Sequence, residues 1–387
     1  MKTSLWLSLI IALRFLGLFI VLPMLSLYAY EQIGSSTFLI GLAIGGYAIT
    51  QMLFQYPLGK LSDKIGRRWV IVFGLLLFIV GSIVAALSED IYMLIVGRLL
   101  QGAGAISSTI TAMISDFTKE EERSKAMALM GGAIAMSFVV SMIFGPLIGG
   151  YFGVETLFEM TAILAFIAII IIIFKVPNPP KIEHNYTEVA SLKTILRNSD
   201  LFRMDIIMFF HSFLMTIAFL MIPLTLVGEF GWEKSALWQV YLPAITLGFL
   251  FMGLAAMLGE AKEKTKLIFQ IAIVFFGLSF LFFGLADNSS LFIIGVVLFF
   301  IGFMMLEPLL QSSVSKIARI HERGAALGVF NSFQFLGVFI GGVVGGSAIQ
   351  YFGMNSASLV FSATTIIWFT WVWGMKNPKK SYFIYHK

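Results

Sequence analysis

The sequence predicts an all-α polytopic membrane protein with twelve transmembrane helices, arranged as two six-helix bundles related by pseudo-twofold symmetry. The first observation is composition: the 387 residues are 59% hydrophobic and only 12% charged, whereas soluble domains carry about 25% charge. The second is length, because apolar runs long enough to cross a bilayer recur twelve times. The third is an internal resemblance between the two halves of the chain at a constant offset of 200 residues.

The apolar runs set the expected positions of the helices. Strands are excluded because those of a membrane β-barrel are shorter and alternate in polarity. Spanning needs roughly 20 apolar residues, and by that measure we expect helices at about 4–30, 38–58, 69–88, 91–115, 124–150, 154–174, 204–228, 236–259, 266–286, 291–315, 324–350 and 356–375.

The distribution of cations tests this assignment. With both termini in the cytoplasm, 23 of the 26 Lys and Arg residues fall in cytoplasmic segments, as the positive-inside rule requires. Only Lys234 lies on the other side, while Arg14 and Arg98 lie within helices. We therefore expect a multi-pass membrane protein with both termini in the cytoplasm, and the formal charge of +5 is explained by topology rather than by nucleic-acid binding.

The longest connection divides the chain into predicted domains. We expect an N-terminal bundle at 1–176, a cytoplasmic linker at 177–203 and a C-terminal bundle with a short tail at 204–387. The linker opens with Pro177-Asn178-Pro179-Pro180, and proline there ends the sixth helix. Residues 189–197 are expected to form a short amphipathic helix on the membrane surface.

The internal repeat is visible in short matches at the same offset. Leu58-Gly59 recurs as Leu258-Gly259, and Tyr151-Phe152-Gly153 recurs as Tyr351-Phe352-Gly353. Such repeats in transporters place a substrate site at the bilayer midplane between the halves and allow rocking about it. The alternative is that the duplication reports ancestry alone.

Four motifs link the chain to a known family. The charged segment Gly59–Arg68, expected to be a ten-residue loop, has the pattern Gly-x-Leu-x-Asp-x-x-Gly-Arg-Arg. It resembles the signature between helices 2 and 3 of the major facilitator superfamily. Leu16-Gly17 with Pro23, Arg98–Gly104 and Gly145–Gly150 resemble signatures of its twelve-helix drug:proton antiporters, although Ser26 and Ser141 replace an expected proline and glycine.

Three shorter segments narrow the resemblance within that family. Arg14–Gly17, Met305–Glu307 and Ser332–Gly337 are similar to segments of the YajR-like group of bacterial transporters. This resemblance implies a location in a bacterial inner membrane.

The resemblance implies a conformational latch on the cytoplasmic side. Its residues are Gly59, Asp63, Gly66, Arg67, Arg68, Asp116 and Arg123. The family pattern implies that Asp63, Arg67 and Asp116 cluster, and that Asp63 faces the positive end of the eleventh helix near Gly324. The alternative is a set of charges that only anchors a loop in water.

Ionisable side chains within helices are the candidates for proton coupling. A charge at mid-helix costs roughly 2.5–3.5 kcal/mol on insertion scales, so each needs a partner or a wet cavity. We expect Arg14 to join a polar network, whereas Arg98 has snorkelling as its alternative. Glu307, the one carboxylate expected at membrane depth, and His211 are candidate proton carriers, with structural hydrogen bonding as the alternative for each.

Three further acids, Asp205, Glu31 and Glu159, lie near predicted helix ends, and we expect them to touch water.

The remaining candidates concern the substrate cavity and a helix bend. If the family fold holds, the polar cavity residues are Gln51, Gln55, Gln101, Asn331 and Gln334, and the apolar ones include Phe15, Phe19, Phe330 and Phe335. The resemblance implies a bend at Gly145, Pro146, Gly149 and Gly150 that prevents proton leak and favours export. The alternative is close helix packing through small residues.

The leading function is a proton-coupled secondary transporter that exports small amphiphilic compounds by alternating access. The alternative is a metabolite or sugar transporter, importing or exporting, on the same fold. The absence of cysteine excludes disulfides and thiol catalysis, and no phosphate-loop, His-Glu-x-x-His or Gly-x-Ser-x-Gly motif occurs. We therefore expect no enzyme activity, no cofactor and no metal; the partners are substrate, protons and lipid, and the protein is expected to be a monomer.

Overall fold

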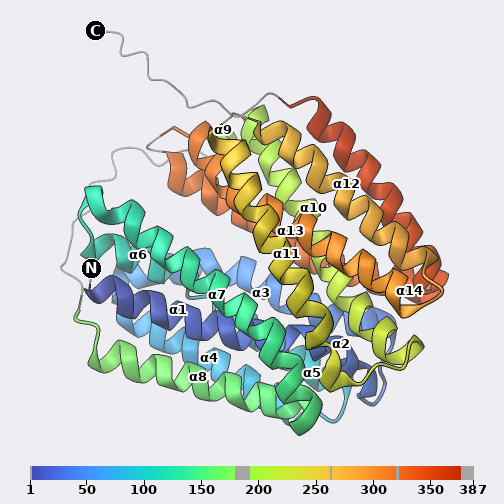
Figure 1. Cartoon of the computed structure of the whole chain (residues 1–387). Coiled ribbons are helices and arrows are strands. Elements are labelled where there is room, and N and C mark those ends of the chain that lie inside the picture. The colour runs from blue at the N-terminus through green and yellow to red at the C-terminus, as the bar shows by residue number, and fades with distance from the viewer. Residues whose placement is uncertain (1, 179–191, 262–263, 320–321, 376–387) are drawn as a thin grey trace. The chain divides into compact units, whose positions relative to one another are not determined.

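The structure is a computed structural model that describes residues 2–178, 192–261, 264–319 and 322–375. Within these ranges, twelve helical segments are long and apolar enough to cross a membrane. The fold prediction is therefore confirmed. The chain divides into two compact units, and each is described by itself (Figure 1).

The first unit comprises residues 1–184, 219–239 and 342–346, within the described ranges. Its elements are α1 (Lys2–Ile20), α2 (Leu22–Glu31), α3 (Thr37–Ile65), α4 (Arg67–Ala86), α5 (Ile91–Ala103), α6 (Ser107–Phe117), α7 (Glu120–Phe152), α8 (Val154–Phe174), the π-helical turn η1 (Thr225–Glu229) and the 3-10 turn η2 (Lys234–Ala236). α3, α4 and α5 pack on one another, and α1 packs against α7 and α8.

Two predicted helices of this unit are broken in the structure. The run expected at about 4–30 divides into α1 and α2 at Val21, with Pro23 in the first turn of α2, where its missing N–H costs nothing. The run expected at about 91–115 divides into α5 and α6 at Gly104. A methyl group added to Gly104 would meet the carbonyl oxygen of Gly74 at 2.3 Å, so the break occurs where two backbones touch.

The predicted ten-residue loop is wrong. α3 continues to Ile65 and α4 begins at Arg67, so only Gly66 interrupts the helices. Gly66 has φ = 100°, a conformation that glycine adopts without a steric penalty. The charged residues thus extend a helix beyond its apolar run, which places Asp63 in the last turn of α3 rather than at the start of the next helix.

The second unit comprises residues 185–218, 240–341 and 347–387, within the described ranges. Its elements are α9 (Leu192–Arg197), α10 (Ser199–Leu224), α11 (Trp238–Ala256), the π-helical turn η3 (Met257–Ala261), α12 (Thr265–Leu285), α13 (Ser289–Ile317) and α14 (Arg323–Trp373). α10 and α14 each contribute a few residues to the first unit.

The predicted surface helix is present only in part. α9 covers Leu192–Arg197, and residues 189–191 lie outside the described residues. α10 begins at Ser199, earlier than expected, because the Asn198 side-chain oxygen accepts from the backbone N–H groups of Asp200 and Leu201. The predicted domain boundaries in this region stay a prediction.

The internal repeat is also conformational. Gly153 and Gly353, 200 residues apart, both have positive φ, at 89° and 76°, and each separates two membrane-spanning segments. Asp90 and Asn288 both cap a helix, accepting from the N–H three residues later at 2.9 Å. The two halves therefore share turn geometry as well as sequence matches.

Candidate functional site

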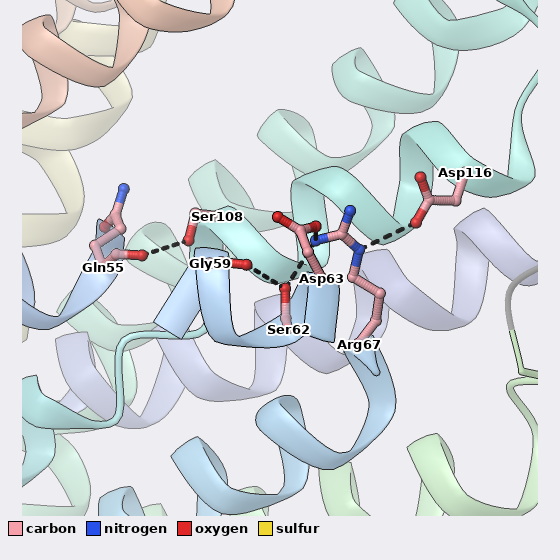
Figure 2. A network of polar contacts seen from close by, with 7 residues as sticks. All are labelled: Gln55, Gly59, Ser62, Asp63, Arg67, Ser108 and Asp116. Atoms are coloured by element: carbon pink, nitrogen blue, oxygen red, sulfur yellow. Dashed lines mark hydrogen bonds and ion pairs between the residues drawn. The ribbon is translucent and has the colours of Figure 1, made fainter. Parts of the chain in front are cut away.

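A charged network lies at the junction of α3, α4 and α6. Figure 2 shows the Arg67 guanidinium between the carboxylates of Asp63 and Asp116. Arg67 Nη1 lies 2.6 Å from Asp63 Oδ1, and Arg67 Nε lies 3.1 Å from Asp116 Oδ2. The Arg67 and Asp116 side chains are 12% and 8% exposed, whereas Asp63 is 59% exposed. Arg67 is thus held mainly from α6, and Asp63 keeps a free aqueous face.

Serine residues that the sequence analysis missed support this network. Arg67 Nη1 donates to Ser62 Oγ at 2.7 Å, and Ser62 Oγ donates to the carbonyl of Gly59 at 2.6 Å. Ser108 Oγ donates to the backbone carbonyl of Gln55 at 3.0 Å (Figure 2). The signal for Ser62 was its position beside Asp63 in a charged segment; nothing in the sequence marked Ser108.

The other predicted latch residues are spread around this junction. Gly66 forms the turn, and Arg68 donates to the backbone carbonyl of Val176, two residues after α8. Arg123 is exposed in the first turn of α7. The expected contact between Asp63 and the helix near Gly324 joins the two units and stays a prediction.

Arg98 lies in a buried polar layer of the first unit. Its side chain is 0% exposed. Arg98 Nε donates to the carbonyl of Ala43 at 3.2 Å, Nη1 donates to Gln101 Oε1 at 2.5 Å, and the guanidinium lies 4.7 Å from the centre of the Tyr47 ring. Gln101 Nε2 in turn donates to Ser82 Oγ at 2.9 Å. These contacts are inconsistent with snorkelling, the alternative raised for this residue.

Arg14 lies in a second buried layer, also at 0% exposure. Its Nη2 donates to Gln51 Oε1 at 3.2 Å, and its guanidinium lies 5.2 Å from the centre of the Phe78 ring and 5.5 Å from that of Phe15. Among the described residues, no carboxylate pairs with Arg14 or Arg98. Two buried cations are therefore solvated only by amides, a carbonyl and ring faces.

Most predicted cavity residues have a definite place in the structure. Gln51 and Gln101 are fully buried partners of the two arginines. The half-buried residues are Gln55, Phe15, Phe19, Asn331, Gln334 and Phe335, whereas Phe330 is buried. Phe19 lies between Phe15 and Phe138, with ring centres 5.3 and 5.4 Å apart.

The predicted helix-bend residues make close helix contacts. A methyl group added to Gly145 would meet the carbonyl oxygen of Ile20 at 2.4 Å, and one added to Gly150 would lie 2.4 Å from the Cα of Ser235. α7 runs from Glu120 to Phe152 without interruption at Pro146. The close approach accounts for the glycines by packing, and a role in proton leak stays a prediction.

His211 and Glu307 lie in the second unit. The His211 ring is 1% exposed and stacks on Phe303 with ring centres 4.5 Å apart, and its Nε2 lies 3.3 Å from the Phe303 carbonyl oxygen. Glu307 follows Phe303 by four residues in α13 and is half-buried. Phe303 and Glu307 therefore lie one turn apart on α13, and His211 of α10 contacts Phe303.

One expectation about acidic residues is wrong. Asp205, expected to touch water, is 2% exposed in α10, and its Oδ2 has no hydrogen-bond partner among the described residues. Glu31 and Glu159 are exposed as expected, and Glu31 Oε1 lies 2.5 Å from Lys234 Nζ. The early start of α10 places Asp205 in the second turn of the helix rather than at its end, and the side chain is buried there.

A helical fold with twelve candidate spans and buried ionisable side chains is that of a polytopic membrane protein. The chain belongs to the Major Facilitator Superfamily, whose profile matches residues 7–342.

Individual relatives agree with this assignment. The chain is 37% identical to the inner membrane transport protein YajR of Escherichia coli (strain K12) over 374 residues, covering 95% of this chain and 82% of YajR. It is 29% identical to multidrug resistance protein 1 of Bacillus subtilis (strain 168) over 359 residues, covering 86% of each. A bacterial homologue of the human lysosomal transporter Spinster has the same fold, with a TM-score of 0.79 at 13% identity, covering 96% of this chain and 95% of that structure.

Proposed function

We propose that this transporter couples proton movement to the export of small amphiphilic compounds by alternating access. The observation that carries the proposal is Glu307, a half-buried carboxylate within the membrane-spanning helix α13. A half-buried carboxylate within a span can take up a proton on one side of the membrane and release it on the other. His211, which stacks on Phe303 one turn before Glu307, is the second candidate proton carrier.

The charged network around Arg67 supports a gating role. In the proposal, Asp63 provides the breakable contact and Asp116 the permanent one, because Asp63 is largely exposed whereas Asp116 is nearly buried. A surface ion pair contributes about 0–1 kcal/mol, so it can open and close within a transport cycle.

Similarity supports export over import without deciding it. Multidrug resistance protein 1 is a drug-resistance protein by name, and its similarity extends over 86% of this chain. A metabolite or sugar transporter on the same fold is the second candidate, since one matched structure is a D-xylose–proton symporter at 14% identity, which shows the fold alone.

Location and assembly form part of the same proposal. We place both termini in the cytoplasm of a bacterium, the chain in the inner membrane, and the functional form as a monomer. The cation distribution supports the orientation, and the inner-membrane location of YajR supports the compartment. Cysteine labelling from each side of intact cells would test the orientation, and a terminus labelled only from outside would contradict it.

The decisive experiment uses proteoliposomes with an imposed pH gradient and a pH-sensitive dye in the lumen. Cationic dyes and common metabolites are added in turn, and we expect at least one amphiphile to elicit proton flux. Glu307→Gln should abolish that flux, whereas Glu159→Gln, which changes an exposed acid of α8, should leave it intact. Equal flux in wild-type protein and Glu307→Gln would refute the assignment of the coupling group.

A further inference from the structure

The two buried arginines of the first unit occupy adjacent levels of the same helix interface. Arg14 contacts Gln51 of α3, and Arg98 contacts Tyr47, four residues earlier on α3. The same spacing appears on α4: Arg14 lies over Phe78, while Arg98 reaches Ser82 through Gln101. Residues four apart lie about 6 Å apart along a helix, so the two guanidinium groups lie about one turn apart.

These guanidinium groups retain unused donors. Arg14 Nε and Nη1, Arg98 Nη2 and Gln51 Nε2 are buried and have no hydrogen-bond partner among the described residues. All four atoms are N–H donors. These two buried layers therefore lack hydrogen-bond acceptors. A ligand group with several acceptor oxygens would supply them.

The charges point to the same conclusion. Two like charges one turn apart in a low-dielectric environment repel each other, and a buried charge is normally paired. No described Asp or Glu of the first unit is buried in the way that Arg14 and Arg98 are. Aromatic faces and amide oxygens carry only partial negative charge, so the side chains in these layers leave two positive charges without a counter-charge.

We propose that Arg14, Arg98 and Gln51 bind the acidic group of an amphiphilic organic anion, such as a carboxylate or a sulfonate. A planar guanidinium matches the two oxygens of a carboxylate. Phe15 and Phe19, half-buried on α1 beside Arg14, offer a ring surface for the apolar body of the ligand. The inference deepens the proposed transport function and rests on it, because both arginines are fully buried here and the ligand enters only when these helices move apart.

The test compares an acid with its neutral isostere on the whole protein in nanodiscs of neutral lipid. The probes are 1-naphthoate and 1-naphthamide, and the readouts are the dissociation constant from probe fluorescence and the shift in thermal unfolding temperature. We expect 1-naphthoate to bind at least 10-fold more tightly than 1-naphthamide and to raise the unfolding temperature. Equal affinity for the two probes would overturn the proposal.

Variants separate the site from general effects. Arg14→Gln and Arg98→Gln should each weaken 1-naphthoate binding at least 10-fold while changing 1-naphthamide binding little. Arg14→Lys and Arg98→Lys retain the charge and should recover part of the affinity, which keeps the test informative if a glutamine variant fails to fold. Lys175→Gln, which removes an exposed cation at the end of α8, is the matched control and should bind like the wild type. Full retention of acid preference in both arginine-to-glutamine variants would refute the assignment.

Varying the chloride in the buffer distinguishes binding of an organic acid from binding of an inorganic ion. Replacing sodium chloride by sucrose at equal osmolality should change 1-naphthoate affinity less than 2-fold, and full competition by chloride would overturn the choice of an organic ligand. Binding is measured without a pH gradient, so it does not depend on proton coupling. Acid-selective binding without proton flux would contradict the proposed proton coupling but not the anion site. Proton flux elicited equally by neutral compounds would contradict the anion site but not the coupling.

Discussion

Arg67 is the residue whose replacement tests the physical reasoning about the charged network most directly. Arg67→Gln removes two ion pairs that differ in burial. The pair with Asp116, between side chains 12% and 8% exposed, is a charge-assisted hydrogen bond of 3.1 Å. Such bonds contribute about 1.5–3 kcal/mol. The pair with Asp63, whose side chain is 59% exposed, is worth at most about 0.5 kcal/mol.

A double-mutant cycle isolates each pair. We expect a coupling free energy of about 2 kcal/mol between Arg67→Gln and Asp116→Asn, and of about 0.5 kcal/mol or less between Arg67→Gln and Asp63→Asn. The measurement is reversible unfolding in mixed micelles with increasing mole fraction of sodium dodecyl sulfate, followed by tryptophan fluorescence. All single and double variants are prepared in the same lipid and detergent.

Transport provides the second readout of the same variants. Asp63→Asn should express and unfold almost like the wild type yet lose transport in vesicles, because its role is to form and break a contact. Asp116→Asn should lose stability. Coupling to Asp63 as strong as that to Asp116 would refute the burial argument, and normal efflux by Asp63→Asn would refute the latch.

Three further variants test separate parts of the structure by the same unfolding assay. Gly41→Ala places a methyl group 2.0 Å from the carbonyl oxygen of Gly342, so we expect a loss of several kcal/mol. Gly131→Ala, with nothing within 4 Å, is its control and should be neutral or gain up to about 1 kcal/mol; equal losses would refute the contact. Gly66→Ala should lower the free energy of unfolding by about 1–2 kcal/mol. The loss comes from the φ of 100° alone, since nothing lies within 4 Å of the added methyl group, and an unchanged stability would show that the turn relaxes. Asp205→Asn should retain or raise stability because it removes a poorly solvated carboxylate, and a loss above about 1 kcal/mol would instead reveal a partner for Asp205.

The turns of the protein illustrate how far local sequence determined the helices. All twelve predicted spans have counterparts in the described residues, because apolar length and the distribution of cations are local properties. Asp90 and Asn288 cap the starts of their helices, and Gly153 and Gly353 separate successive spans, roles that suit these residue types. The charged segment between Gly59 and Gly66 was misjudged because charge indicates exposure to water, and an exposed segment is as compatible with a helix as with a loop.

The sequence alone also identified the residues that can carry a charge or a proton within the membrane, since an ionisable side chain within an apolar run is conspicuous. Arg14, Arg98, His211 and Glu307 were all found in this way. The sequence did not determine how they are partnered. Whether Arg98 snorkels or pairs with Gln101, and whether Asp205 touches water, depends on which neighbouring helix covers each side chain.

Only the tertiary structure decided these pairings, because they join residues far apart in the chain. The approach of α3 and α4 places Arg14 and Arg98 in successive layers, and α6 brings Asp116 to Arg67. Hydropathy averages over a window of residues and identifies a membrane span, but it contains no information on the direction in which one side chain points. The sequence therefore determined the membrane fold and its chemically active residues, while helix packing decided which of those residues share a site.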